Sequence, residues 1–252
     1  MISIYNQLIE KSIKGVKSFA VLIDPDKLDE ISLKRIIDLS EESNVDYFFL
    51  GGSLLSKYNT PEIIKTIKQR SAIPVVLFPG GHLQVEPSAD AILFLSLISG
   101  RNADFLIGQH VIAAPIIKQS RLEVLPTGYL LVDCGTQTTA SYISNTTPLP
   151  YDKPAIAAAT AMAGEMMGLK LMYLDGGSGA MQPVNVEMIA TVKKTVSCPL
   201  IVGGGINNEA KALAALSAGA DVIVVGTGIE NDPLLMVSIS KQVVNFNLDS
   251  VR

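Results

Sequence analysis

The strongest constraint on the fold is a regular alternation of short apolar runs with longer segments of helical periodicity. Eight apolar runs occur, at residues 19–24, 46–53, 74–80, 91–99, 122–134 (with 129–133 as the body of the strand), 169–177, 199–205 and 221–226. Strands that are buried on both faces have continuous apolar runs of this kind. Helical patterns occupy residues 28–43, 60–70, 104–120, 155–168, 184–196, 207–219 and 232–246, after an amphipathic opening at 4–16. The alternation predicts an α/β fold with a parallel sheet.

Two architectures share this alternation, a closed (β/α)8 TIM barrel and a doubly wound open sheet. Glycine clusters after the sixth, seventh and eighth runs favour the barrel, where a phosphate site commonly forms at that place. The gap at residues 81–90, after the third run, is too short and too broken for a normal helix. We predict one barrel domain over residues 1–252, with a long loop at 135–154 that is rich in Thr, Ser and Pro.

Composition limits the classes of partner. The net charge of −4 argues against a nucleic-acid surface, which needs a basic excess. No apolar run long enough to span a membrane occurs, and the first residues lack the pattern of a signal peptide, so we expect a cytoplasmic protein. The isolated Cys134 and Cys198 form no CxxC metal or redox motif. The mean hydropathy of +0.36 indicates apolar surface that an oligomer or a ligand groove would cover.

The three glycine clusters lie where predicted strands pass into predicted helices. Glycine has no Cβ, so the backbone can turn sharply and expose N–H groups to an anion, and a helix start directly behind adds free donors. One cluster alone would equally well permit only a tight turn, but three in succession predict a phosphate site. The residues concerned are Gly176, Gly177, Gly179, Gly204, Gly205, Gly226 and Gly228, and Ser178 adds a hydroxyl.

Carboxylates follow two of the predicted strands. Asp175 ends the sixth run, where it would act as a general base on a substrate hydroxyl or would instead cap a helix or bind loop amides. Tyr173 shares its face of the strand and suits either a ligand contact or a core position. Asp24 ends the first run and, with Ser53 after the second, offers oxygen ligands for Mg²⁺; a turn residue is the alternative for Asp24. Asp26 or Asp29 would cap the next helix, and we predict this role for Asp26.

Other polar residues are less specific. Thr60 is predicted to cap a helix, with Pro61 at its first position. His82 is expected near the mouth of the barrel, and His110 is expected to be structural in the middle of a helix. Arg101 suits either a diphosphate contact or an ordinary solvated or ion-paired position.

Together the motifs resemble those of the geranylgeranylglyceryl phosphate synthase family of prenyltransferases over nearly the whole chain. They are Asp24-Pro-Asp-Lys27, Gly51-Gly-Ser53, Phe78-Pro-Gly80, Ser99-Gly-Arg-Asn102, Tyr173-Leu-Asp-Gly-Gly-Ser-Gly179, Gly203-Gly-Gly-Ile206 and Gly226-Thr227. The resemblance implies a modified TIM barrel in which a loop replaces the third helix. It also implies transfer of a geranylgeranyl or other long prenyl group from a prenyl diphosphate to the 3-hydroxyl of sn-glycerol 1-phosphate.

The resemblance implies a role for particular residues. Mg²⁺ would be held by Asp24 and Ser53, and Asp175 would be the catalytic base. The glycerol phosphate would be held by Tyr173, Leu174, Asp175, Gly176, Gly177, Ser178, Gly179, Gly204, Gly205, Gly226 and Thr227. Many members of the family have Glu-Ala at the position of Asp175-Gly176 and Gly-Asn at that of Gly226-Thr227. A homo-oligomer, either a dimer or a hexamer, and a peripheral membrane contact for the lipid product are expected as well.

Three alternatives to a prenyltransferase remain, and the first two would use the same glycine clusters. A phosphate-binding isomerase or lyase would need neither a metal at the first strand nor an apolar groove. An FMN-binding oxidoreductase would place its cofactor phosphate on the same turns, and an inactive scaffold would use none of them. The prenyltransferase needs an apolar trough, which we expect to open where the third helix is missing.

Overall fold

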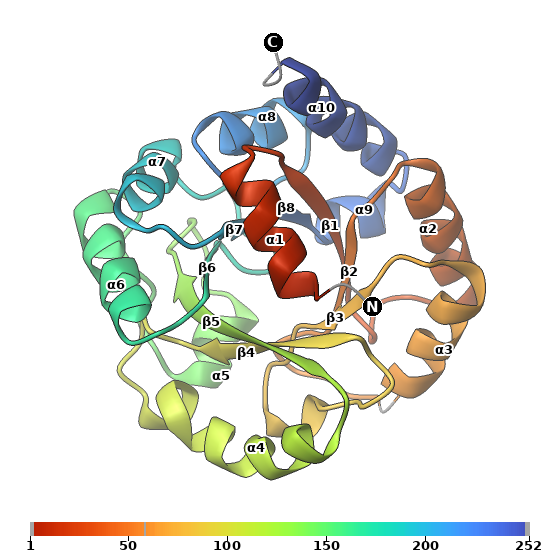
Figure 1. Cartoon of the computed structure of the whole chain (residues 1–252), viewed down its shortest axis with the longest axis horizontal. Helices are drawn as coiled ribbons and strands as arrows, with labels where there is room; N and C mark the ends of the chain where they lie inside the picture. The colour runs from red at the N-terminus through yellow and green to blue at the C-terminus, as the bar shows by residue number, and fades with distance from the viewer. Residues whose placement is uncertain (1–2, 58, 250–252) are drawn as a thin grey trace.

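Eight parallel strands pair in chain order and close into a barrel, with β1 hydrogen-bonded to both β2 and β8 (Figure 1). A computed structural model of the chain describes residues 3–57 and 59–249, so the ends of the predicted domain at 1–2 and 250–252 lie outside the described residues. The strands are β1 (Ser18–Ile23), β2 (Tyr47–Leu50), β3 (Val75–Leu77), β4 (Ala91–Ser96), β5 (Glu123–Leu131), β6 (Leu171–Asp175), β7 (Leu200–Gly203) and β8 (Val222–Val225). Closure confirms the TIM barrel and excludes the open sheet.

Helices form a ring around the barrel (Figure 1). They are α2 (Glu30–Glu42), α3 (Thr60–Arg70), α4 (Gln109–Gln119), α6 (Pro154–Met166), α7 (Val186–Thr195), α8 (Glu209–Ser217) and α10 (Leu235–Asp249). Shorter pieces are α5 (Thr139–Ser144), α9 (Thr227–Asn231), the 3₁₀ turn η1 (His82–Gln84) and the π-helical turn η2 (Asp104–Gly108), which leads into α4. Each ring helix lays one apolar face on the strands, as Leu33, Ile36 and Ile37 of α2 do.

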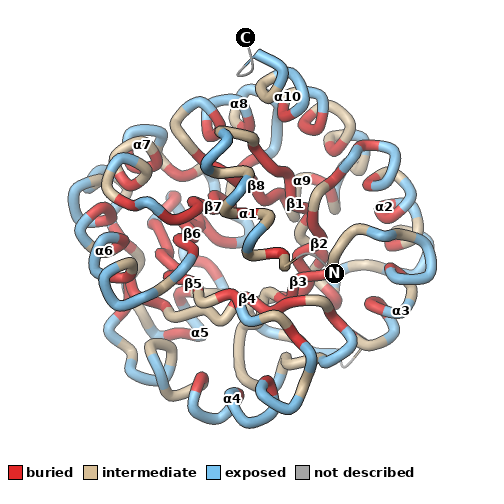
Figure 2. Tube along the Cα trace, viewed as in Figure 1, coloured by how far each residue is buried: buried red, intermediate tan, exposed pale blue. Residues whose placement is uncertain are grey.

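Successive residues of a strand face opposite sides, and this divides the core into two layers. Side chains such as Phe49, Leu131 and Ile201 fill the inside of the barrel, whereas Phe48, Leu130 and Leu200 pack between the strands and the helices. Figure 2 shows the strands as a buried ring with the outer faces of the helices exposed. The core therefore closes the barrel and leaves its carboxyl-terminal rim for function.

The amino-terminal helix α1 (Ile4–Ile13) lies across one end of the barrel (Figure 1). Its Ile4 and Leu8 are buried with the inner layer. The Glu123 carboxylate, at the start of β5, accepts hydrogen bonds from the N–H groups of Ile4 and Tyr5 at 2.7 and 2.9 Å. These contacts attach α1 to the amino-terminal ends of the strands, opposite the predicted site.

A loop replaces the barrel's third helix, as expected. Between β3 and β4 the chain makes only the turn η1, so α3 and α4 follow one another in the ring (Figure 1). Gly51, at the end of β2, comes so close to this loop that a Cβ there would lie 2.1 Å from the carbonyl oxygen of Phe78. The loop is therefore tied to the rim of the barrel by close backbone contact.

Several local predictions were wrong. Residues 135–154 are not all loop, because α5 forms there behind a capping box made by Thr138 and Ser141. The predicted range 122–134 does contain β5, but the body predicted at 129–133 is wrong. β5 begins at Glu123 and ends at Leu131, since its first half pairs with β4 in spite of Pro126. The short helix α9 was not predicted.

Two of the predicted caps were also wrong. Asp29, not Asp26, caps α2, and the Asp26 carboxylate instead accepts the N–H groups of Ser56 and Lys57. Thr60 is the first residue of α3, so Pro61 is the second, and the preceding Asn59 turns its amide to the carbonyl of Pro25 at 2.9 Å. Both changes join the loop after β1 to the loop after β2. No helix in the described ranges is both long and apolar enough to cross a membrane.

Candidate functional site

The glycine clusters after β6, β7 and β8 line one pocket at the carboxyl-terminal rim. Gly177 and Gly179 have φ values of +81° and +79°, and Gly204 and Gly205 have +81° and +69°. A Cβ at Gly204 would lie 2.6 Å from the backbone nitrogen of Gly176, so two of the turns touch through their backbones. Only glycine allows both this conformation and this approach.

The turns expose backbone donors. Within residues 3–57 and 59–249, the N–H groups of Ser178, Gly179, Gly204, Gly205 and Thr227 have no hydrogen-bond acceptor in the protein. The Ser178 and Thr227 hydroxyls lie 3.4 Å apart and add further donors. Only α9 begins directly behind its glycine; α7 and α8 begin several residues after theirs, contrary to expectation. The arrangement suits a tetrahedral anion such as phosphate.

Asp175 lines this pocket and is 6% exposed. One carboxylate oxygen accepts the Tyr129 hydroxyl at 2.6 Å, and the other accepts the Gly177 N–H at 2.8 Å. The loop-amide contact considered from the sequence is therefore present. Burial raises the pKa of Asp175, and the two hydrogen bonds oppose that increase. A carboxylate with a raised pKa beside an anion pocket is suited to general-base chemistry.

Aromatic rings surround this carboxylate. Tyr173 is buried in the inner layer, stacks on Phe78 with centroids 5.3 Å apart, and meets the edge of Tyr129 at 5.5 Å. Tyr173 is thus a core aromatic that also borders the pocket. Burial is the main cause that raises the pKa of Tyr129 and Tyr173 well above the ordinary value, and the nearby Asp175 charge raises it further. Each hydroxyl therefore stays protonated.

Asp24, after β1, borders the same pocket beside two further charged groups. The Lys27 ammonium lies 3.3 Å from Asp24 Oδ2 and 3.2 Å from Glu230 Oε2. The other Asp24 oxygen accepts the N–H of Asp26 at 3.1 Å, which is the turn role considered as the alternative. Burial lowers the pKa of Lys27, but the two carboxylates raise it by more, so the net shift is upward. Burial raises the pKa of Glu230, opposed by Lys27.

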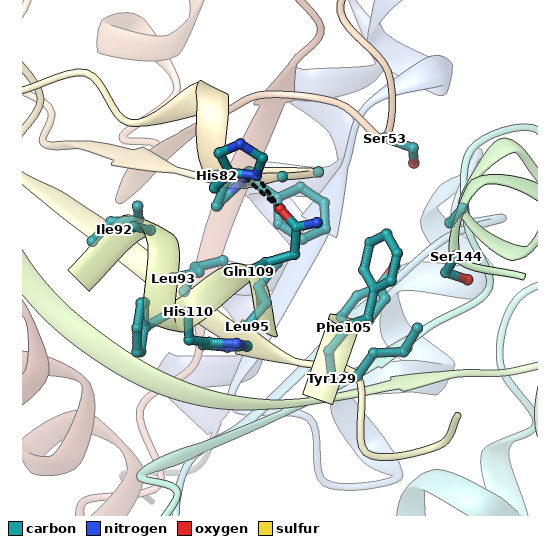
Figure 3. A pocket seen from close by; sticks show the side chains of 18 of the residues that line it. Ser53, His82, Ile92, Leu93, Leu95, Phe105, Gln109, His110, Tyr129 and Ser144 are labelled. Atoms are coloured by element: carbon teal, nitrogen blue, oxygen red, sulfur yellow. Dashed lines mark hydrogen bonds between the residues drawn. The ribbon is translucent and has the colours of Figure 1, made fainter. Parts of the chain in front are cut away.

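A second, apolar pocket adjoins the first (Figure 3). Ser53, Phe78 and Tyr129 border both pockets. The other walls of the apolar pocket come from β4, η2, α4 and α5, and include Leu93, Leu95, Phe105, Ala113 and Ile143. Figure 3 shows this pocket between η1 and α4, where a regular barrel would have its third helix. The apolar trough expected from the sequence is therefore present.

A few polar groups interrupt the apolar wall. The ring of His82 hydrogen-bonds to the side chain of Gln109, as the dashed line in Figure 3 shows. His110 is 9% exposed and meets the edge of Phe94 at 4.5 Å, and burial lowers its pKa, so the imidazole is neutral at pH 7. His82 lies at a pocket as expected, whereas His110 lies at the start of α4 and also borders the pocket.

The structure brings together nearly all the residues singled out from the sequence. Twelve line the pocket of the glycine turns: Asp24, Ser53, Tyr173, Asp175, Gly177, Ser178, Gly179, Gly204, Gly205, Gly226, Thr227 and Gly228. Leu174 and Gly176 do not, because Leu174 faces the outer core layer and a Cβ at Gly176 would lie 2.9 Å from the Cys134 sulfur. Arg101 borders neither pocket and donates to the carbonyl of Gly100 at 2.7 Å.

Sequence reasoning missed Tyr129, Lys27 and Glu230 as site residues. Lys27 belongs to the quoted Asp24-Pro-Asp-Lys27 motif, so its position next to Asp24 was an available signal. Tyr129 and Glu230 carried no such signal, because one looked like a strand aromatic and the other lies in the unpredicted helix α9.

Known proteins resemble this chain over nearly its whole length. "Geranylgeranylglyceryl phosphate synthase" from Spirosoma linguale is 58% identical over 245 residues, which is 97% of this chain and 98% of that protein. The protein of that name from Chitinophaga pinensis is 52% identical over 240 residues, 95% of each chain. The crystal structure of (S)-3-O-geranylgeranylglyceryl phosphate synthase from Thermoplasma acidophilum, in complex with substrate sn-glycerol-1-phosphate, matches with a TM-score of 0.90. That match has 31% identity and covers 96% of this chain and 99% of the other.

A family model agrees with these matches. The model described as the PcrB family matches residues 10–244, which include all eight strands and both pockets. The chain therefore belongs to the PcrB family.

Proposed function

We propose that this chain is a prenyltransferase that joins a geranylgeranyl or other long prenyl group to the 3-hydroxyl of sn-glycerol 1-phosphate. The observation that carries the proposal is the junction of two unlike pockets, an anion cradle of glycine turns and an apolar trough, which share Ser53, Phe78 and Tyr129. The similar proteins named above bear the name of this activity. An isomerase or lyase acting on a small phosphorylated substrate would have no use for the trough.

The residues divide the reaction between them. The glycine turns hold the phosphate, which fixes the acceptor hydroxyl close to C1 of the prenyl chain and gains from proximity. The C1–O bond of the prenyl diphosphate breaks, and the diphosphate leaves with the electron pair. The acceptor oxygen forms the ether bond to C1, and its proton passes to Asp175. The apolar trough holds the prenyl chain and keeps water from the reacting carbon, C1.

Asp24 and Ser53 suit a magnesium ion. Both offer hard oxygen donors to one pocket, and the absence of a side chain at Gly52 leaves the Asp24 carboxylate clear, since a Cβ there would lie 3.5 Å from it. Mg²⁺ commonly takes one or two protein oxygens and completes its shell with water and substrate phosphate. When bound, it would stabilise the negative charge that develops on the leaving diphosphate.

Two apolar surfaces of the protein suit contacts with larger partners, a second copy of the protein and a membrane. The groove between α6 and η2 has apolar walls that include Ile156, Ala159 and Met167, and we propose it as a contact between copies in a homo-oligomer, a dimer or a hexamer. Ile143 on α5 lines the trough and is partly exposed, and the exposed Leu83 on η1 directly follows His82, which lines it too. We propose Leu83 and Ile143 as a peripheral contact with a membrane that receives the lipid product. The cytoplasmic location also remains part of the proposal.

A product assay tests the function. The purified chain is incubated with Mg²⁺, radiolabelled glycerol 1-phosphate of either hand, and prenyl diphosphates of several lengths. We expect label in the organic phase only with the sn-1 isomer, and a loss of roughly 10²- to 10⁴-fold in kcat for Asp175→Asn. No transfer from any donor, with glycerol phosphate still bound, would favour the isomerase or lyase. A yellow protein with bound FMN would favour the oxidoreductase.

A further inference from the structure

Lys27 joins three separate parts of the rim. Its ammonium lies 3.2 Å from the Ser178 hydroxyl in the turn after β6, 3.2 Å from Glu230 in α9, and 3.3 Å from Asp24 after β1. The Ser178 hydroxyl is in turn 3.4 Å from that of Thr227. The Lys27 ammonium therefore lies directly beside the two hydroxyl groups that border the pocket of the glycine turns.

The charge of the cradle is unfavourable for a phosphate dianion without this ammonium. The residues that line the pocket, all within the described ranges, include three carboxylates (Asp24, Asp175 and Glu230) but a single cationic side chain, Lys27, for a formal charge of −2. The other donors of the cradle, backbone N–H groups and hydroxyls, carry no net charge. Coulomb repulsion between a dianion and these carboxylates is considerable at distances of a few ångströms.

We propose that Lys27 is the cationic phosphate ligand of this site, held between Asp24 and Glu230 in the free protein and turned onto the phosphate of the acceptor when it binds. This inference rests on the proposed function for the identity of the acceptor. The side chain of Lys27 is 40% exposed, and a lysine is a point charge on a flexible stem, so the ammonium can change partners within the pocket. Glu230 acts through Lys27 and is a positioning residue.

Binding of sn-glycerol 1-phosphate, measured by titration calorimetry without Mg²⁺, tests the inference. We expect Lys27→Met to raise Kd about tenfold or more, because it removes a charge-assisted hydrogen bond to the phosphate. In the transfer assay, KM for glycerol phosphate should rise while KM for the prenyl diphosphate stays within about twofold. Lys27→Arg, which keeps the charge, should recover most of the affinity. Lys34→Met, which breaks an exposed pair on α2, is the matched control and should leave Kd unchanged.

Glu230→Gln separates a phosphate ligand from a merely structural ion pair. It removes a charge that repels the phosphate and competes for Lys27, so the inference expects Kd to stay equal or fall. If the pair only held the rim in shape, both Lys27→Met and Glu230→Gln would weaken binding. That result, or a Kd for Lys27→Met within twofold of the wild type in a folded protein, overturns the inference.

Inorganic phosphate as a second probe distinguishes this inference from the function on which it rests. Transfer by the wild type together with unchanged binding by Lys27→Met would reject the role of Lys27 and keep the transferase. Absence of transfer by the wild type, with phosphate binding that still depends on Lys27, would reject the transferase and keep the role of Lys27. Thermal unfolding of each variant establishes that it is folded before binding is compared.

Discussion

At the scale of the residue, the environment of Asp175 sets the pH at which it can accept a proton. Burial raises its pKa, while the Tyr129 hydroxyl and the Gly177 N–H lower it by binding the charged form. Activity that needs the carboxylate is therefore lost as pH falls through this raised value. The sign for stability is opposite: with a folded pKa above the unfolded one, this carboxyl contributes stability at low pH, and the contribution is lost as pH rises through the folded pKa.

Tyr129→Phe removes one of the two hydrogen bonds and keeps the ring in both pockets. We expect the pKa of Asp175 to rise further, so the acidic limb of the kcat/KM profile moves to higher pH while the rate at high pH changes less. The profile is measured from about pH 5 to 9 in both proteins. An unchanged limb would mean that Asp175 is not the group that titrates. Phe78→Leu, which changes the wall but not this hydrogen bond, is the control.

At the scale of the element, the loop between β3 and β4 decides whether the protein has the apolar pocket. A third helix of ordinary size would cover the space between η1 and α4 that Figure 3 shows as the apolar pocket. The opposite end of the barrel is closed by α1, which Glu123 holds by its first N–H groups. The two ends of the barrel therefore serve separate purposes, chemistry at one and stability at the other.

Ala113→Phe places a large ring on the face of α4 that borders the trough. We expect KM to rise more for long prenyl diphosphates than for short ones, and KM for glycerol phosphate to stay the same. Steady-state kinetics with donors of graded length measure this. Because overpacking costs about 1–3 kcal/mol, the variant must be shown to be folded. An equal rise in KM for every donor would indicate that the prenyl group binds outside this pocket.

Glu123→Gln weakens the attachment of α1 without touching the rim. We expect the free energy of unfolding to fall by about 1–2 kcal/mol, as for the loss of a helix cap, with kcat unchanged. Denaturant titration measures it. Glu10→Gln, on the exposed face of α1 and paired with Lys14, should leave the free energy of unfolding nearly unchanged, because water screens an exposed ion pair. A similar loss in the free energy of unfolding for both variants would show that Glu123 does not specifically attach α1 to the barrel.

At the scale of the whole molecule, α6 presents two different faces. Ala157, Ala158, Ala161 and Gly164 are buried against the barrel, whereas Met167 is 71% exposed at the end of an apolar groove. A sequence rich in alanine and methionine suits a core helix and an interface helix equally well. In the structure one face is core, and the other is free to meet a second copy.

Met167→Lys tests this face. A charge within an apolar contact should raise the dimer or hexamer dissociation constant by at least about tenfold, measured by sedimentation velocity over a range of concentrations. Ile13→Lys, at an even more exposed apolar residue on α1, should leave the assembly unchanged. A wild-type chain that sediments as a monomer at every concentration would contradict the proposed oligomer.

The sequence by itself determined the strands, the order of the glycine turns and the two carboxylates at strand ends. These are local properties: continuous apolar runs, residues without a Cβ, and positions relative to the end of a run. It failed at α5 and at the caps, where six-residue helices and neighbouring aspartates give weak or competing local signals.

Only the tertiary structure decided which side chains meet. Closure brings β8 beside β1, so Glu230 reaches Lys27 from about 200 positions away in the chain, and Ser178 does so from about 150. The pairing of β5 with β6 likewise sets Tyr129 beside Tyr173 and its hydroxyl on Asp175. No local pattern encodes such contacts, because they depend on the register and curvature of the whole barrel.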